Sequence, residues 1–491
     1  MKIHTLIAVS MLFSLSACNE LLDLIKEDVN SIELDNQLSI LIEQHNMNDT
    51  ISGESNLPDI SSPIAQLGKK LFFSQSLSGD LNVACASCHH PALAGADALS
   101  LSIGANAVDS DVLGGGRLAI DNDFDVGRNA PTVFNTGLWR DGLFWDSRVE
   151  FVQGGISTPD SNFETVDLNA GSTLAAAQAK FPVTSNSEML GDEFAQFENN
   201  DGVRDHLAQR MGNYGLHINV FDTNQWLTEF QLGFDSSESS EVLITFNNIA
   251  FAMGEYERSM LFVDSPWRQY VNGDINALSD SQKRGAQLFL TDDNNNGANC
   301  VQCHQGPTFT DERFNLVAFP QFGIKTNDDQ GDIGREAVSN NQNDRYRFRT
   351  ASLLNVELTA PYGHAGTYQT LEEVVAHYDN PRESVEDFFV ENKMCDLTQF
   401  KNIENCDSIF NNAQNISMAA LQEIGQRRRP GRNGSGSTLD NIQLNQDEQN
   451  DIVEFLRALT DVCASDLDCL TPWIADNVLD NPDGQMLKAK F

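Results

Sequence analysis

Cys85-Ala86-Ser87-Cys88-His89 and Cys300-Val301-Gln302-Cys303-His304 are the two stretches that decide the fold of this 491-residue chain. Each has two cysteines separated by two residues and a histidine directly after the second cysteine, which is the attachment pattern of a c-type haem. The two thiols bond to the vinyl groups of the porphyrin, and the adjacent His89 or His304 reaches the iron. A zinc site would need a second pair of ligands close to each motif, and none follows either motif. The sequence therefore predicts two covalently bound haems.

A similar segment precedes each motif. Residues 64–73 have apolar side chains at helical spacing around Gly68 and end in Leu-Phe-Phe, and residues 281–289 repeat the glycine and the Leu-Phe pair. This internal repeat predicts two related helical domains, each built around a haem. Strand-like alternation is scarce, so we expect an all-α chain. Its expected parts are a polar tether and helical arm over 19–55, a first haem domain over 56–265 and a second over 266–491.

The N-terminus predicts export. Met1-Lys2 precedes a short apolar stretch over 6–15, which ends in Leu15-Ser16-Ala17-Cys18 and resembles a bacterial lipoprotein cleavage site. We expect residues 1–18 to be the signal, with a lipid on Cys18 that anchors a periplasmic protein to a membrane. Asn19 favours the outer membrane. The alternative is an ordinary cleaved signal with a chance cysteine.

The remaining cysteines fit an oxidising compartment. Of nine cysteines, one is the expected lipid site and four are haem thiols, which leaves Cys395, Cys406, Cys463 and Cys469. Three pairings are possible. Nearness in sequence favours 395 with 406 and 463 with 469.

The formal net charge of −40 argues against nucleic acid as a partner and limits membrane binding to the lipid anchor. Either a basic electron carrier is attracted to this surface or the charge forms a solvated acidic shell.

Two segments resemble insertions. The first is polar and covers 157–187. The second covers 427–437 and is basic, then flexible; it is either a solvated loop or a docking site for an acidic partner. After the second, Asn445 is expected to cap a helix through Ile452 and Leu459.

From about residue 58 to 461 the chain resembles the bacterial di-haem cytochrome c peroxidase family, which includes MauG. The resemblance rests on five stretches in the family's order, which are residues 67–73, 85–91, 127–132, 144–148 and 354–364. It implies a peroxide-reacting haem in the first domain and an electron-transfer haem in the second. It also implies a calcium ion between them, held by Asn129 and by the backbone carbonyls of Thr359 and Pro361.

The resemblance also assigns catalytic residues. Gln153 has the spacing of the family's distal glutamine, and Glu188 matches the glutamate that moves a proton between peroxide oxygens. The insertion over 157–187 lengthens the interval between them, and the alternative for Glu188 is a surface acid. Trp145 matches the tryptophan between the haems, where an indole can relay electrons and also pack in the core.

Two departures from the family's pattern concern the irons. Members that need reductive activation carry a blocking histidine after Ser-Ile-Gly, whereas Ser102-Ile103-Gly104 is followed here by Ala105, which cannot ligate iron. We expect an open first haem, because His90, His206 and His217 are poor substitutes.

At the second haem, Tyr378 occupies the position of a methionine ligand, with His377 as the second candidate and Met394 as the third. A phenolate favours ferric and higher oxidation states, whereas methionine raises the potential.

Three functions remain open. The first is a periplasmic peroxidase that reduces hydrogen peroxide with electrons from a cytochrome or cupredoxin. The second is a MauG-like oxidase that uses peroxide equivalents to modify side chains of a partner protein. The third is a non-enzymatic electron carrier, which has no need of an open iron beside Gln153 and Glu188.

Overall fold

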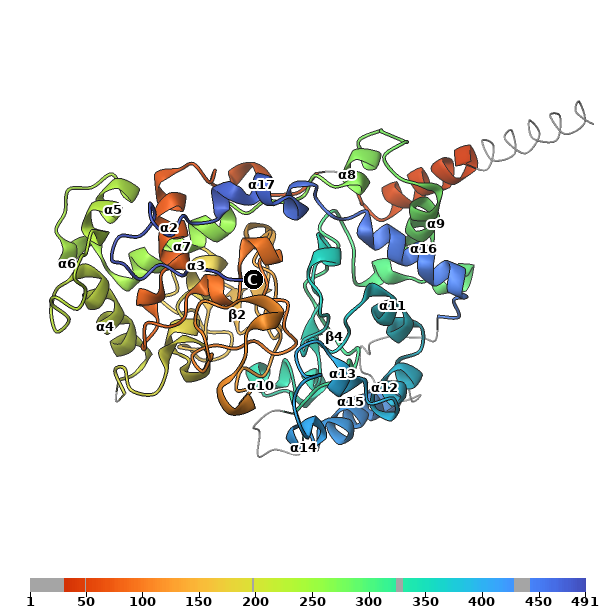
Figure 1. Ribbon diagram of the computed structural model, residues 1–491. Coiled ribbons are helices and arrows are strands. Elements are labelled where there is room, and N and C mark those ends of the chain that lie inside the picture. Colours follow the sequence, from red (N-terminus) through yellow and green to blue (C-terminus); the bar gives the residue numbers. More distant parts are fainter. Residues whose placement is uncertain (1–30, 49, 197, 324–329, 428–441) are drawn as a thin grey trace, which may run out of the picture.

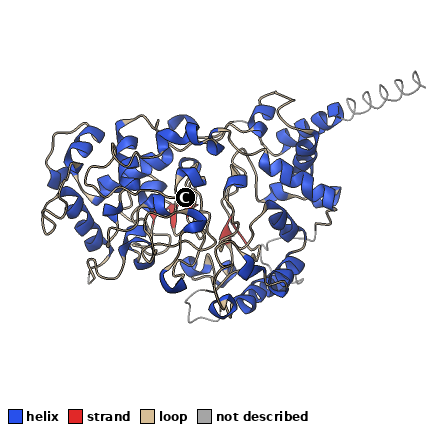
Figure 2. Cartoon of the chain, viewed as in Figure 1, coloured by secondary structure: helices blue, strands red, loops and turns tan. Residues whose placement is uncertain are grey.

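The computed structural model describes residues 31–48, 50–196, 198–323, 330–427 and 442–491. The fold is mostly helical, and Figure 2 shows two small patches of sheet near the middle of the molecule. The expected all-α class is therefore corrected to mostly α. The α-helices are α2 Pro63–Phe73, α3 Leu174–Gln178, α4 Asn200–Gly212, α5 Trp226–Gly233, α6 Ser240–Leu243, α7 Phe246–Arg258, α8 Pro266–Val271, α9 Asp280–Leu290, α10 Glu336–Ser339, α11 Leu371–Asp379, α12 Pro381–Val390, α13 Lys393–Asp396, α14 Cys406–Ile409, α15 Ala413–Arg427, α16 Gln446–Arg457 and α17 Leu467–Leu470.

The helix before each haem motif crosses a later helix at a glycine. A Cβ added to Gly68 on α2 would lie 1.9 Å from the carbonyl oxygen of Ala252 on α7. A Cβ added to Gly285 on α9 would lie at the same 1.9 Å from the carbonyl oxygen of Asp451 on α16. Only glycine lets the two backbones come this close. Both halves of the chain therefore use the same contact to cover a haem motif.

A three-stranded antiparallel sheet has the order β1-β2-β3, with β1 Gly142–Leu143, β2 Val149–Val152 and β3 Gly155–Ser157. The turn between β1 and β2 carries residues 144–148. A second sheet pairs β4 Phe314–Asn315 with β5 Phe348–Arg349. Both sheets lie near the middle of the molecule, and the turn of the first carries one of the family stretches (Figure 1).

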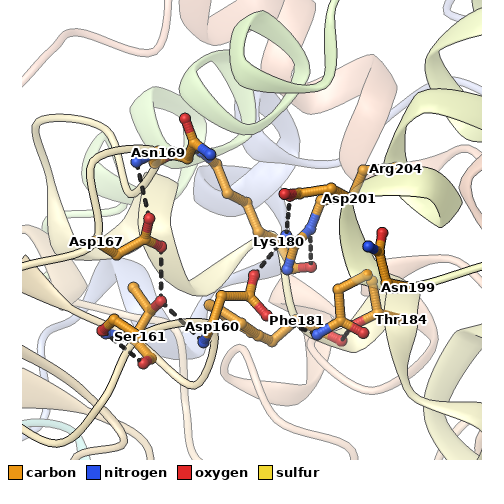
Figure 3. Close-up of polar contacts among 12 residues, drawn as sticks. Asp160, Ser161, Asp167, Asn169, Lys180, Phe181, Thr184, Asn199, Asp201 and Arg204 are labelled. Carbon is orange, nitrogen blue, oxygen red and sulfur yellow. Dashed lines mark hydrogen bonds and ion pairs between the residues drawn. The ribbon is translucent and has the colours of Figure 1, made fainter.

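The segment over 157–187 folds against the first sheet rather than standing apart from it. Leu174 and Phe181 are buried with Val149 and Ile156 in one apolar cluster. Arg204 on α4 donates to the Asp160 carboxylate at 2.6 Å and to the Lys180 carbonyl at 3.0 Å (Figure 3). The polar side chains of this segment therefore supply a partly buried ion pair with α4 as well as contacts with solvent.

The C-terminal tail returns to the first half of the chain, as the blue segment of Figure 1 shows. The Leu487 amide donates to the Phe73 carbonyl at 3.0 Å, and the Leu113 amide donates to the Lys490 carbonyl at 2.8 Å. The end of the expected 266–491 domain therefore packs on the expected 56–265 domain.

Several local expectations can be compared directly. Residues 31–44 are helical, as expected for the arm, and Asn445 caps α16 through Asp447 and Glu448. Disulfides join Cys395 to Cys406 and Cys463 to Cys469. Cys18, the signal and nearly all of 427–437 lie outside the described residues. Among the described residues, no helix is both long and apolar enough to cross a bilayer.

Candidate haem and peroxide site

Both haem motifs have the same local geometry. Each begins on a short 3₁₀ turn, Cys85–Ser87 or Cys300–Gln302, and the four thiols are not in disulfides. His89 Nδ1 lies 3.1 Å from the Gly95 carbonyl oxygen, and His304 Nδ1 lies 3.1 Å from the Phe309 carbonyl oxygen. This contact fixes the ring orientation and leaves Nε2 to face an iron. Burial lowers the pKa of both imidazoles, so the neutral form that ligates iron is favoured.

The second motif opens into a cavity of about 630 Å³. Cys300, Cys303 and His304 line it, and so does the Tyr378 side chain from α11. Arg349 also lines this cavity, and its buried Nη1 has no partner among the described residues. Arg313 and Arg347 are lining residues as well. Because guanidinium groups pair with carboxylates, these arginines fit the propionates of a haem attached to the two thiols.

Tyr378 and His377 are adjacent on α11 but have different surroundings. His377 is fully buried, with Nε2 2.8 Å from the Val317 carbonyl oxygen and Nδ1 2.8 Å from the Tyr368 hydroxyl. Both of its ring nitrogens are therefore engaged. Tyr378 faces the cavity, and burial, followed by the nearby Cys303 and Cys300, raises the pKa of its phenol. Met394, the third candidate ligand, is buried in the apolar core and is not a lining residue.

At the first motif, the loop over 102–105 lies against Glu188. The Ala105 amide donates to the Ser187 carbonyl at 3.2 Å, and a Cβ at Gly104 would lie 2.4 Å from the Glu188 carbonyl oxygen. Arg117, which is 1% exposed, donates to the carbonyls of Ile103 at 2.8 Å and Gly104 at 3.2 Å. The Ser-Ile-Gly-Ala loop is thus held on both sides.

Glu188 belongs to a single π-helical turn, Asn186–Leu190. Burial raises the pKa of its carboxyl, against the smaller opposite effect of Arg148 and Arg128. Burial raises the pKa of the Cys88 thiol, and the Glu188 charge raises it further. The Cys88 Sγ lies 3.9 Å from the Ile103 carbonyl oxygen. A carboxyl with a raised pKa more readily holds a proton that it can donate and take back.

Trp145 lies on the wall of the second cavity and comes from the β1–β2 turn of the first half. Its Nε1 donates to the Asn129 carbonyl at 2.9 Å. The same cavity is lined by Asn129, Thr359 and Pro361. The side-chain amide nitrogen of Asn129 donates to the Leu99 carbonyl at 2.7 Å. The Asn129 side-chain oxygen and two carbonyls are neutral hard donors of the kind that calcium takes.

The other residues considered for the first haem have the following surroundings. Gln153 is exposed at the turn between β2 and β3, and its role as the distal glutamine of the first haem stays a prediction. His90 is buried against Phe73 and accepts a hydrogen bond from the Ala92 amide at 3.1 Å. His206 and His217 bond to each other at 2.8 Å. These three imidazoles are each committed to a local contact.

An arginine network that sequence reasoning missed joins the two halves. Arg128 donates to Asp332 at 2.6 and 2.8 Å and to Asp146 at 2.6 Å. Burial disfavours the Asp332 carboxylate, yet the Arg128 guanidinium lowers its pKa to about 2. The only sequence signal was the presence of Arg128 and Asp146 inside two family motifs, because Asp332 lies far away in sequence.

Comparisons with known proteins identify related sequences and folds. The model of the di-haem cytochrome c peroxidase family matches residues 62–276. The match covers less than half of the chain, and over this span the chain is similar to that family. The chain is therefore an oxidoreductase of the cytochrome c peroxidase type, and the family implies two c-type haems.

Two curated relatives represent both branches of the family. Cytochrome c551 peroxidase of Pseudomonas aeruginosa is 29% identical over 65% of this chain and 73% of its own length. The methylamine utilization protein MauG of Methylophilus methylotrophus is 27% identical over 70% of this chain and 80% of its own. The chain is therefore similar to both relatives at nearly the same identity.

Solved structures share the fold. The diheme peroxidase BthA of Burkholderia thailandensis has a TM-score of 0.52 at 20% identity, covering 86% of this chain and 89% of its own. A MauG-like protein associated with microbial copper homeostasis has a TM-score of 0.51 at 21% identity, covering 84% and 94%.

Proposed function

We propose that this peroxidase works in the periplasm, where it reduces hydrogen peroxide with electrons from a cytochrome or cupredoxin. The observation that carries the proposal is the contact between Glu188 and the loop that ends in Ala105. Glu188, whose carboxyl pKa is raised by burial, follows Ser187, whose carbonyl accepts from the Ala105 amide at 3.2 Å. Alanine at this position would leave the first iron unblocked. An electron carrier would have no need of this arrangement.

The two haems, when bound, supply the redox chemistry that reduces peroxide. Cys85 and Cys88 hold the first haem, and Cys300 and Cys303 hold the second. Glu188 would move a proton between the peroxide oxygens, and burial, which raises the pKa of its carboxyl, helps it to hold that proton. Tyr378 would ligate the iron of the second haem through its phenol oxygen, a role supported by the engagement of both nitrogens of His377. Trp145 would carry electrons between the two haems, a role supported by its place on the wall of the C-terminal cavity.

The wider arrangement belongs to the same proposal. Two cytochrome c-like domains, related by the glycine crossings at Gly68 and Gly285, each enclose one haem. A calcium ion bound by Asn129, Thr359 and Pro361 would stiffen the region between them. A lipid on Cys18 would anchor the protein, preferably to the outer membrane.

Replacing Glu188 by glutamine tests this function. Glutamine keeps the shape but cannot transfer the proton, so peroxide reduction with a reduced small cytochrome should fall by about 10²- to 10⁴-fold. Haem content, measured by absorbance, should not change. Glu193→Gln, at an exposed acid in the same segment, is the control and should keep full activity. An unchanged rate in the Glu188 variant would contradict the proposed role.

Tyr378 favours a second candidate, the MauG-like oxidase. A phenolate on the second iron stabilises oxidised states, which suits the storage of oxidising equivalents for a protein substrate. This candidate predicts that peroxide, added without an electron donor, leaves new covalent changes on a periplasmic partner protein detectable by mass spectrometry. Rapid donor-dependent peroxide turnover without such changes would favour the peroxidase.

A further inference from the structure

The β1–β2 turn that carries Trp145 has an unfavourable backbone. Phe144 has φ 69° and Ser147 has φ 49°, both in the left-handed region that non-glycine residues rarely adopt. Such conformations are unfavourable and persist only when the surroundings hold them. The turn therefore needs external contacts to keep its shape.

Two arginines of the C-terminal half supply these contacts to four consecutive carbonyls. Arg349 donates from Nε to the Phe144 carbonyl at 3.3 Å and from its backbone amide to the Trp145 carbonyl at 2.8 Å. Arg335 donates from Nη1 to the carbonyls of Asp146 and Ser147, each at 2.9 Å. The backbone on both sides of the indole is thus tied to the opposite half of the molecule.

Arg335 is built into the structure rather than lying on the surface. It is 6% exposed, and its Nη2 binds both oxygens of the Glu150 carboxylate, at 2.9 and 2.7 Å. Its guanidinium lies 4.5 Å from the Phe314 ring centroid and 5.1 Å from that of Phe163. The Arg335 guanidinium therefore contacts the turn, the strand β2 that follows the turn, and the sheet of the second half.

We propose that Arg335 is a positioning residue that presets the Trp145 turn, so that the path between the two haem sites is formed before peroxide arrives. The inference rests on the proposed relay role of Trp145. It extends that role by assigning the alignment of the indole to a side chain that touches neither haem motif. One electron passes from the second haem to the first along this path, and no bond to Trp145 forms or breaks.

The test compares Arg335→Gln with Arg345→Gln. Arg345 comes from the same segment but pairs with Glu336, so its variant is the matched control. In Arg335→Gln, hydrogen exchange of the amides over 145–149, measured by mass spectrometry, should speed up by about tenfold or more as the turn opens. The control should exchange like the parent. Equal exchange in the Arg335 variant and the parent would overturn the proposal.

A double-mutant cycle separates positioning from general stability. Electron transfer between the haems, followed by flash photolysis of the holoprotein, should slow by about 10- to 100-fold in Arg335→Gln, since a misplacement of about 1 Å has effects of this size. In a Trp145→Phe background the Arg335 substitution should have no further effect. Additive effects would mean that Arg335 does not act through Trp145.

Two further results complete the test. If Arg335→Gln does not fold, Arg335→Lys gives the same comparison, because an ammonium group can pair with Glu150 but cannot bridge both carbonyls as the fork does. Normal electron transfer in Trp145→Phe alone would refute the relay role, whereas normal exchange in the Arg335 variants would refute only the positioning role.

Discussion

Replacing Gly104 by alanine tests whether the backbone around Glu188 controls peroxide reduction. The added Cβ would lie 2.1 Å from the Ser187 carbonyl oxygen and 2.8 Å from the Glu188 Cα. A carbon–oxygen contact needs about 3.3 Å, so one side must move by about 1 Å. Arg117 holds the carbonyls of Ile103 and Gly104, so the displacement falls mainly on Ser187 and Glu188. A shift of about 1 Å in a reacting group costs about 10²-fold in rate.

We therefore expect kcat/KM for peroxide to fall by about 10²-fold in Gly104→Ala, with both haems still attached. Stopped-flow reduction of peroxide by a reduced donor gives the rate, and absorbance gives the haem content. Gly127→Ala is the control, because nothing lies within 4 Å of its added Cβ, and its rate should stay within about twofold of the parent. A Gly104→Ala protein with full haem content and the parent rate would refute the reasoning.

Three further predictions follow from other residues. Tyr378→Met should raise the reduction potential of the second haem, and redox titration showing an unchanged potential and spectrum would mean that Tyr378 is not its ligand. Burial raises the pKa of Glu257 from 4.5 to about 8, so its contribution to stability is complete below pH 4.5 and is lost as the pH rises through 8. Glu257→Gln should thus have a higher Tm than the parent at pH 9 but not at pH 4, and calorimetry showing parallel Tm curves would contradict this. Cys18→Ala should release the protein from membranes or stall its processing, and unchanged fractionation and processing would show that Cys18 is not lipidated.

Much of the helical fold follows from local sequence patterns. The apolar spacing before each haem motif predicts α2 and α9, and Asn445 predicts the start of α16. The small sheets were not predicted, because strands of two to four residues are too short to show alternation. The return of the C-terminal tail to Phe73 was also missed, since it depends on backbone hydrogen bonds between distant segments.

Some residues of the candidate site could also be predicted from the sequence, and others could not. The thiols and proximal histidines are adjacent in sequence, so their chemistry can be predicted without a structure. Tyr378 and His377 are neighbours on one helix and point in different directions, so only tertiary contacts distinguish them. Nothing in the sequence indicated the role of Arg335. Two of its hydrogen bonds end on backbone carbonyls, which every residue has, and two end on the carboxylate of Glu150, which is far away in sequence. The distal role of Gln153, which lies on an exposed turn, stays a prediction from its spacing.

Electron paramagnetic resonance of the fully ferric holoprotein, followed by peroxide addition, tests the central claim most directly. The claim is that the first iron is open at rest because Ala105 stands where other members carry a blocking histidine. We predict one high-spin ferric haem and consumption of peroxide without prior reduction. Two low-spin ferric haems, with activity appearing only after partial reduction, would contradict it.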